Sequence, residues 1–364
     1  MKWSFQIAEY RGIAVYVHAT FLILIGMVVL SHWAVGHDLM KALEGAAFML
    51  ALFACIVLHE FGHALTALHF GIRTKDITLY PIGGVARLER MPEEPIHELQ
   101  VAFAGPAVNV AIAFALFLGL RLSGSLGPIE SLNMTSGPLL VRIMLANAGL
   151  AAFNLLPAFP MDGGRVLRAA LATRLDYARA TRIAATAGQA MALLFGLVGF
   201  FANPFLMFIA LFVWIGAAQE AGQVEMRSAL QGLSVARAME TAYRSLSPDD
   251  PLTLAVDATL ASSQQDFPVV VANQVVGLLT RHDLLEGLAR RGASSPVADS
   301  MRREFVTADA SETLEAALRK LEGGNVRSVP VLSDGRLAGL VTLDNVGDLL
   351  AIRAALARRP GSGA

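Results

Sequence analysis

The sequence is poor in cysteine and in charge, and both shortages restrict what the chain can be. Its single cysteine, Cys55, excludes an intrachain disulfide. Charged residues make up only 16% of the chain and the formal net charge is −1, so we expect no nucleic-acid partner. Hydrophobic residues reach 55% and the mean hydropathy is +0.54, which is too apolar for an ordinary soluble protein.

The apolar residues are concentrated before about Gly222, and the chain from about Ser234 onward has the composition of a soluble protein. We predict six membrane-spanning segments, each long enough to cross about 30 Å of hydrocarbon as a helix. They lie at residues 13–33, 43–70, 99–121, 138–157, 182–201 and 204–220. The first run follows Lys2 and Arg11 but has no A-x-A cleavage site, so we interpret it as a retained transmembrane helix rather than a secretory signal.

The predicted fold class is a polytopic α-helical membrane domain of about six transmembrane helices, followed by a soluble α+β pair. The segment Thr74–Glu89 is neither helix nor span, and its single proline, Pro81, and its glycine pair predict a short hairpin-like loop dipping toward the membrane. The expected boundaries are 1–222 for the membrane domain, 223–233 for a linker, 234–292 and 293–357 for the two soluble domains, and 358–364 for a disordered tail.

Positive charge is uneven between the short loops, which predicts the orientation. Arginines and a lysine are concentrated in the loops after the second and fourth predicted spans, whereas the loops after the first and third offer little beyond Lys41 and Arg121. By the positive-inside rule, both basic loops, both termini and the whole C-terminal half are expected to be cytoplasmic. We therefore expect a multi-pass protein of the cell (inner, cytoplasmic) membrane.

The most informative motif is His59-Glu60-Phe61-Gly62-His63, which follows a run of apolar residues. An H-E-x-x-H motif places two imidazoles on one face of a helix, where both can bind one Zn²⁺, with the glutamate placed to move a proton. Ionisable groups at bilayer depth are expensive and mark functional sites. The motif therefore predicts a catalytic zinc site with His59 and His63 as ligands and Glu60 as the general acid–base residue.

A catalytic zinc usually takes a third protein ligand. Asp162 stands in a segment broken by two prolines and two glycines, where the chain can turn a carboxylate inward. Spacing alone leaves two alternatives open for it, a metal ligand or the cap of the following helix. Glu220 is the rival acidic ligand.

Three ordered motifs in residues 1–220 resemble the site-2 protease family of intramembrane zinc metalloproteases. They are H-E-F-G-H, the A-G-P-x-x-N segment Ala104–Asn109, and N-x-x-P-x-x-P-x-D-G-G-R from Asn154 to Arg165. The resemblance implies that Asp162 is the third zinc ligand and that Asn154 positions the substrate carbonyl or oxyanion. It also implies that the loop Thr74–Glu89 pairs with an unwound substrate as an added strand.

The soluble half contains an internal repeat of about sixty residues, each copy predicted as helix, strand, strand, helix. The two copies resemble a tandem pair of CBS domains, a family that often binds adenine nucleotides such as ATP or AMP and commonly dimerises. The family's ribose-contacting pattern is matched in the first copy by Thr280 and Asp283, but the second copy has Asn345 where the aspartate would be. The resemblance therefore implies at most one good nucleotide site. A dimerisation or spacer module with no ligand is the alternative.

We accordingly predict a zinc-dependent intramembrane endopeptidase with one Zn²⁺ per chain, acting in regulated intramembrane proteolysis. Its substrate would be a membrane-associated regulatory protein, such as an anti-sigma or pro-sigma factor, and its CBS pair would sense a nucleotide and favour a homodimer or higher oligomer. The alternative is a transporter or channel gated by the CBS pair, with the His/Asp cluster as its ion site. Six helices without an evident duplicated half argue against the alternative.

Overall fold

The structure is a computed structural model that describes residues 3–36, 38–81, 83–89, 91–92, 94–127, 137–324 and 326–357. The predicted disordered tail, 358–364, lies outside them. Contacts divide the chain into two compact units, Met1–Val224 and Glu225–Ala364. Helix α7 (Pro204–Leu230) runs without a break through this boundary, so residues 223–230 of the predicted linker are helical.

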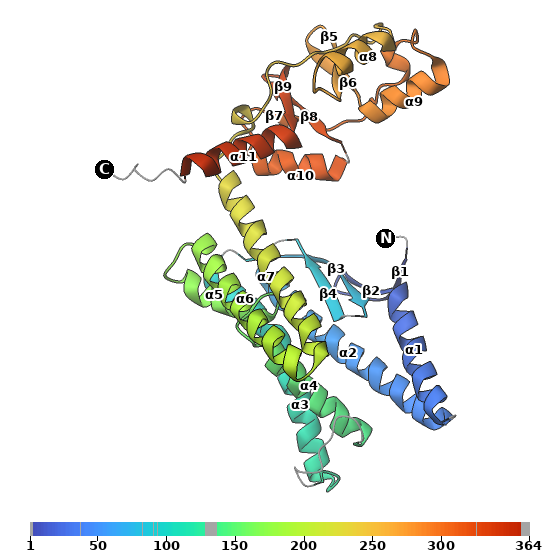
Figure 1. Ribbon diagram of the computed structural model, residues 1–364, viewed down its shortest axis with the longest axis vertical. Coiled ribbons are helices and arrows are strands. Elements are labelled where there is room, and N and C mark those ends of the chain that lie inside the picture. Colours follow the sequence, from blue (N-terminus) through green and yellow to red (C-terminus); the bar gives the residue numbers. More distant parts are fainter. Residues whose placement is uncertain are drawn as a thin grey trace. The chain divides into compact units, whose positions relative to one another are not determined.

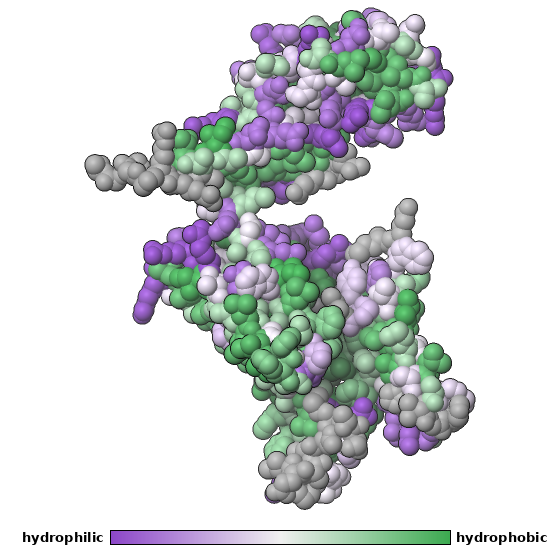
Figure 2. All heavy atoms as spheres, in the orientation of Figure 1, coloured by the Kyte–Doolittle hydropathy of each residue, from purple (hydrophilic) through white to green (hydrophobic). Residues whose placement is uncertain are grey.

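The first unit is a helical bundle with a small sheet (Figure 1). Besides α7, its helices are α1 (Ala19–Gly36), α2 (Leu39–His69), α3 (Pro95–Leu122), α4 (Leu139–Asn154), α5 (Asp162–Ala172) and α6 (Tyr177–Phe201). Among the described residues, four helices are long and apolar enough to cross a membrane, namely α2, α3, α6 and α7. Large apolar side chains on this unit remain exposed, including Phe114, Leu193 and Phe208 at 63%, 65% and 70%, and hydrophobic residues cover much of its visible face in Figure 2.

The first and fourth predicted spans are shorter than expected. Residues Ile13–His18 form strand β2, and α1 begins only at Ala19. Ile13, Val15 and Val17 alternate on the buried face of that strand, a period-two pattern hidden by the apolar residues between them. Helix α4 ends at Asn154 instead of reaching residue 157, because the prolines that follow disfavour helical backbone before them.

A four-stranded sheet accompanies the helices of the first unit. Its strands are β1 (Ser4–Tyr10), β2 (Ile13–His18), β3 (Thr74–Tyr80) and β4 (Gly83–Leu88), in that spatial order. Strands β1 and β2 pair antiparallel, as do β3 and β4, whereas β2 and β3 pair parallel. The predicted hairpin-like loop is therefore β3–β4, and it is extended by two strands that the hydropathy pattern did not indicate. Helix α2 contacts β3 and β4, and the small core between them contains Ile13, Ala64 and Ile77.

The connection from α4 to α5 is short and tightly packed, and it contains a cis Phe159–Pro160 peptide. A methyl group added at Gly163 would lie 2.2 Å from the Leu156 carbonyl oxygen, and one at Gly164 would lie 2.5 Å from the Phe159 nitrogen. Only glycine fits at either position. This close approach sets the first turn of α5, which begins at Asp162.

The second unit consists of two copies of one motif, as the internal repeat predicts. The first copy contains α8 (Leu252–Ala261), β5 (Phe267–Val271), β6 (Gln274–Leu279) and α9 (Arg281–Arg291). The second contains α10 (Leu314–Gly324), β8 (Ser328–Ser333), β9 (Arg336–Thr342) and α11 (Leu343–Ala357), with a short strand β7 (Ala308–Asp309) paired to β8. Each copy has its own apolar core, built around Leu252 and Phe267 in the first and around Leu314 and Val329 in the second.

Candidate metal centre

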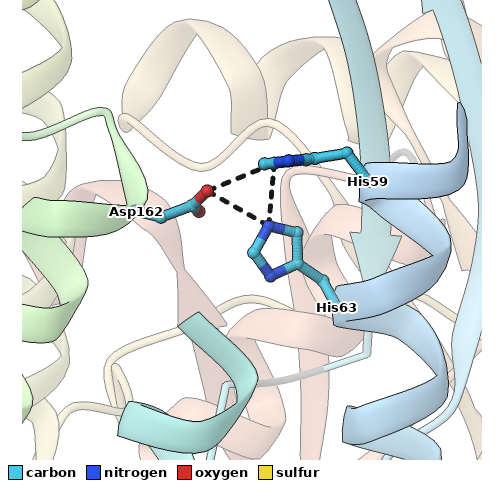
Figure 3. A group of neighbouring side chains, drawn as sticks. All are labelled: His59, His63 and Asp162. Carbon is cyan, nitrogen blue, oxygen red and sulfur yellow. Dashed lines mark hydrogen bonds and ion pairs between the residues drawn. The ribbon is translucent and has the colours of Figure 1, made fainter. Parts of the chain in front are cut away.

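Three buried side chains from two distant parts of the sequence converge in the helical unit (Figure 3). His59 and His63 lie one turn apart on α2, and Asp162 opens α5, 99 residues after His63. The two Nε2 atoms are 3.1 Å apart, and Asp162 Oδ2 lies 3.2 Å from each. Only 5–7% of each residue is exposed. Helices α2 and α5 therefore present these atoms to a single point in the interior rather than to solvent.

The other ring nitrogen of each histidine faces a protein acceptor. His63 Nδ1 lies 2.7 Å from the Val101 carbonyl oxygen, and His59 Nδ1 lies 2.5 Å from Asn109 Oδ1. The Asn109 amide is oriented by its own donor, because Asn109 Nδ2 donates to Asn147 Oδ1 at 2.8 Å. Both Nδ1 atoms must therefore carry the proton, which leaves the lone pair of each Nε2 pointing at Asp162.

These atoms fit a zinc ion. Two imidazole lone pairs and a carboxylate oxygen are all acceptors, so their convergence is repulsive unless a cation or a proton lies among them. Ligands about 2.0–2.1 Å from a tetrahedral zinc stand roughly 3.3–3.4 Å apart. The observed spacings of 3.1–3.2 Å are close to that figure. His59, His63 and Asp162 would hold the ion and leave a fourth position for a water molecule or substrate.

Two glycines let α3 approach the histidine pair closely. A methyl group added at Gly105 would lie 2.2 Å from His63 Nε2 and 2.7 Å from His59 Nε2. On the facing helix, a methyl group at Gly62 would lie 2.7 Å from the Ala104 carbonyl oxygen. In the A-G-P-x-x-N segment, Gly105 therefore lies against the two imidazoles and Asn109 lies behind His59.

The three ligands open onto a cavity of about 440 Å³. Glu60 and Asn154 line it, so the predicted catalytic residues share one space with the predicted ligands. Strand β4 forms part of the wall, and at Gly84 an added methyl group would lie 2.9 Å from the Glu60 Cγ atom. Sequence reasoning gave Asn109 no role in the site, although its place in the A-G-P-x-x-N segment was a usable signal.

The rival ligand Glu220 does not reach this cavity. It accepts a hydrogen bond of 2.6 Å from Arg168 Nη1, and Arg168 also donates to Glu98 from Nε at 2.8 Å. Glu98 and Arg168 are 0% and 1% exposed. Glu220 is therefore part of a buried ion cluster that joins α3, α5 and α7, and the proposal of it as a metal ligand is wrong.

In the second unit, Thr280 and Asp283 are neighbours but Asp283 is already engaged. Thr280 donates to Asp283 Oδ2 at 2.5 Å, and Arg302 Nε donates to the same oxygen at 2.6 Å. Burial by itself would raise the pKa of Asp283, but the hydrogen bonds from Arg302 and Thr280 outweigh it and hold that pKa below its ordinary value. A ribose could bind this carboxylate only by displacing Arg302.

Thr280 also lines a cavity of about 460 Å³ together with three arginines, Arg281, Arg302 and Arg327. Asp266 closes one side, where its carboxylate accepts hydrogen bonds from the Arg281 backbone N–H and from Ser328. The excess of guanidinium groups suits an anionic ligand. Asp283 does not line this cavity.

Comparison with known proteins identifies both units. Residues 47–136 and 125–195 match Peptidase family M50, and residues 235–290 and 297–351 match the CBS domain. Zinc metalloprotease MJ0392 of Methanocaldococcus jannaschii is 31% identical over 352 residues, covering 95% of this chain and 96% of the relative. The chain belongs to peptidase family M50.

A second relative agrees with this assignment. Rip3 of Mycobacterium tuberculosis is 31% identical over 327 residues, covering 85% of this chain and 81% of the relative. The solved site-2 protease of Methanocaldococcus jannaschii is 37% identical, with a TM-score of 0.45 and coverage of 60% of this chain and 95% of that one. By its family match and its relatives, this M50 protease is a multi-pass membrane zinc metalloprotease with a tandem CBS pair.

Proposed function

We propose that this M50 protease hydrolyses a peptide bond in or near a transmembrane segment, at the cavity bounded by His59, His63 and Asp162. One observation carries the proposal. The two imidazoles and the carboxylate meet within 3.2 Å of one another, next to Glu60, inside a bundle of membrane-capable helices. A zinc ion held there supplies a water acidic enough to attack a peptide carbonyl at neutral pH.

Glu60 is the proposed general base and acid. It follows His59 directly on α2 and lines the same cavity, so its carboxylate can accept the proton of the attacking water and deliver it to the leaving amine. Asn154 lines the cavity from the end of α4. Its side-chain amide is proposed to donate to the substrate carbonyl oxygen and to the oxyanion that develops there.

A transmembrane substrate must unwind before its carbonyl can reach these groups, because its backbone is hydrogen-bonded within its own helix. Strand β4 stands at an edge of the sheet, and Gly83, Gly84 and Val85 line the cavity. The free edge of β4 is therefore proposed to pair with the unwound segment as a fifth strand, which holds it across the metal centre. Because Gly84 has no side chain, β4 itself can lie directly against Glu60.

The experiment is zinc content and cleavage of a candidate membrane substrate by wild type, Glu60→Gln and Asp162→Asn. We expect Glu60→Gln to retain zinc and lose cleavage by several orders of magnitude, because only the proton carrier is removed. Asp162→Asn should lose both zinc and cleavage. Undiminished hydrolysis by purified Glu60→Gln would refute the proposed mechanism. If the wild type cleaved no substrate but carried metal ions across vesicle membranes, the result would instead support the ion-transport alternative.

The proposed substrate class is a membrane-associated regulatory protein, such as an anti-sigma or pro-sigma factor, and the proposed location is the cell membrane with the CBS pair cytoplasmic.

The arginine-lined cavity at Thr280 favours an adenine nucleotide bound through its phosphates, with Asp283 available to a ribose only after Arg302 moves. The CBS pair, with proposed limits 234–292 and 293–357, is also the proposed contact in a homodimer. Nucleotide can alter cleavage only by binding two states of the protease with different affinity.

A further inference from the structure

Arg165 is a cationic side chain in the active-site cavity for which the metal chemistry has no use. It lies on α5 three residues after Asp162, so the two side chains share one face of the helix. Arg165 lines the same cavity as Glu60 and Asn154. Its Nε atom is buried and finds no hydrogen-bond partner among the residues that the structure describes.

The next arginine on the same helix shows what a structural arginine looks like here. Arg168 bonds two carboxylates, Glu98 and Glu220, and its guanidinium lies 5.0 Å from the Phe159 ring centroid and 4.9 Å from that of Tyr177. Within the described part of the chain Arg165 forms no such hydrogen-bonded ion pair, although the carboxylates of Glu60 and Asp162 are close enough to interact with its charge. A buried N–H donor without an acceptor is unfavourable, so a ligand that supplies an acceptor to Arg165 Nε would bind more tightly for it.

The charges in the cavity favour an anion as that ligand. The formal charges of a divalent ion and of the Glu60 and Asp162 side chains sum to zero, so the guanidinium of Arg165 adds one positive charge to the cavity. Hydrolysis creates the matching negative charge. The water oxygen joins the carbonyl carbon, which becomes a carboxylate, and both water protons go to the nitrogen, which leaves as an ammonium group when the C–N bond breaks.

We propose that Arg165 binds the new C-terminal carboxylate of the N-terminal cleavage product. Arginine suits this role because its planar fork can donate two parallel hydrogen bonds to one carboxylate. The consequence is product inhibition: a released fragment that ends in a free acid competes with substrate, whereas the same fragment ending in an amide competes poorly. This inference rests on the proposed active site.

The test compares two fluorescent peptides of one sequence, ending at the cleavage site found by mass spectrometry, one a free acid and one a carboxamide. Binding is measured by anisotropy on the full-length protein in a neutral detergent, with zinc bound and after chelation. Wild type should prefer the acid in both states. Arg165→Gln should lose about ten- to hundred-fold of that preference with unchanged zinc content, and Arg165→Lys should retain part of it.

Exposed Arg174, in the turn after α5, provides the matched control, and Arg174→Gln should bind both peptides as wild type does. An equal acid-to-amide ratio in wild type and Arg165→Gln would overturn the proposal, as would a wild-type preference that vanishes with zinc. If Arg165→Gln loses its fold, Arg165→Lys decides, since a ratio identical to that of wild type would exclude a bidentate contact. Failure of wild type to cleave at all would instead refute the proposed function.

Discussion

At the scale of single residues, the metal centre depends on groups that do not bind metal. Asn109 fixes the ring of His59, and Asn147 fixes Asn109 by accepting its Nδ2–H and donating to the Ile143 carbonyl oxygen at 2.9 Å. Asn109 and Asn147 are both 0% exposed. A relay of buried amides thus holds one imidazole with the correct nitrogen deprotonated, and it links α2, α3 and α4 behind the site.

Replacing Asn109 with leucine should therefore weaken zinc binding without removing a ligand. We expect about a 10- to 100-fold loss of zinc affinity, because His59 loses the acceptor that sets its tautomer and ring orientation. Competition with a fluorescent chelator measures it. Asn154→Ala is the control, since Asn154 lines the cavity from another helix and should lose activity while keeping zinc. Equal zinc affinities of Asn109→Leu and wild type would show that the relay is incidental.

Gly105 gives a second prediction at this scale. Gly105→Ala should abolish stoichiometric zinc binding, because its new methyl group would stand 2.2 Å from His63 Nε2. Gly119, on the same helix, has open space where its methyl group would go, so Gly119→Ala should keep full zinc content. Metal analysis of the two purified variants makes the comparison. Zinc bound normally by Gly105→Ala would mean that α3 does not press on the histidines.

At the scale of elements, the buried cluster of Glu98, Arg168 and Glu220 joins α3, α5 and α7. Arg168 lies on α5, the helix that begins at Asp162, so the cluster also fixes the helix that presents the third ligand. Because α7 continues to Leu230, the same cluster anchors the helix that enters the CBS unit. A buried ion pair contributes little net stability when intact, but removing one partner leaves uncompensated charge.

Arg168→Met should consequently destabilise the protease strongly. We expect a loss of about 3–5 kcal/mol, because Glu98 would be left buried without its cation. Thermal unfolding of the detergent-solubilised protein should show a clear fall in midpoint temperature. The exposed arginine variant Arg174→Met serves as control and should unfold like wild type. If both variants unfold at the wild-type temperature, the cluster does not support the fold.

At the scale of the whole molecule, the chain has two units with separate cores, and all three proposed zinc ligands lie in the first. A ligand stabilises the native state that binds it, by an amount set by its affinity. The CBS unit contains no described cluster of histidine, cysteine and acidic residues able to hold a metal. Metal and nucleotide should therefore act on different unfolding transitions.

Chelation of zinc should lower the unfolding temperature of the helical unit and leave that of the CBS unit unchanged. Calorimetry with and without a chelator separates the two transitions, and proteolysis followed by mass spectrometry assigns them. Restoring zinc should restore only the first transition. A single transition that shifts as a whole would show that the two units unfold cooperatively.

Local patterns in the amino-acid sequence were enough to predict the chemistry of the site and the order of the domains. The four-residue spacing of His59 and His63 is local, so a helical period suffices to put both rings on one face. Long apolar runs predicted α2, α3, α6 and α7, and the sixty-residue repeat predicted the CBS pair, because each pattern is written in consecutive residues. The same local reasoning failed at residues 13–18, where an apolar strand and an apolar helix look alike.

Which side chains from distant parts of the sequence meet could be seen only in the folded protein. Nothing in the spacing could choose between Asp162 and Glu220, because each is far along the chain from the histidines and either could be turned inward. The choice follows from close contacts, with the Gly163–Gly164 turn carrying Asp162 to the imidazoles while Arg168 holds Glu220 elsewhere. Distances across a packed interior depend on side-chain volumes from many segments at once, and no single stretch of sequence contains them.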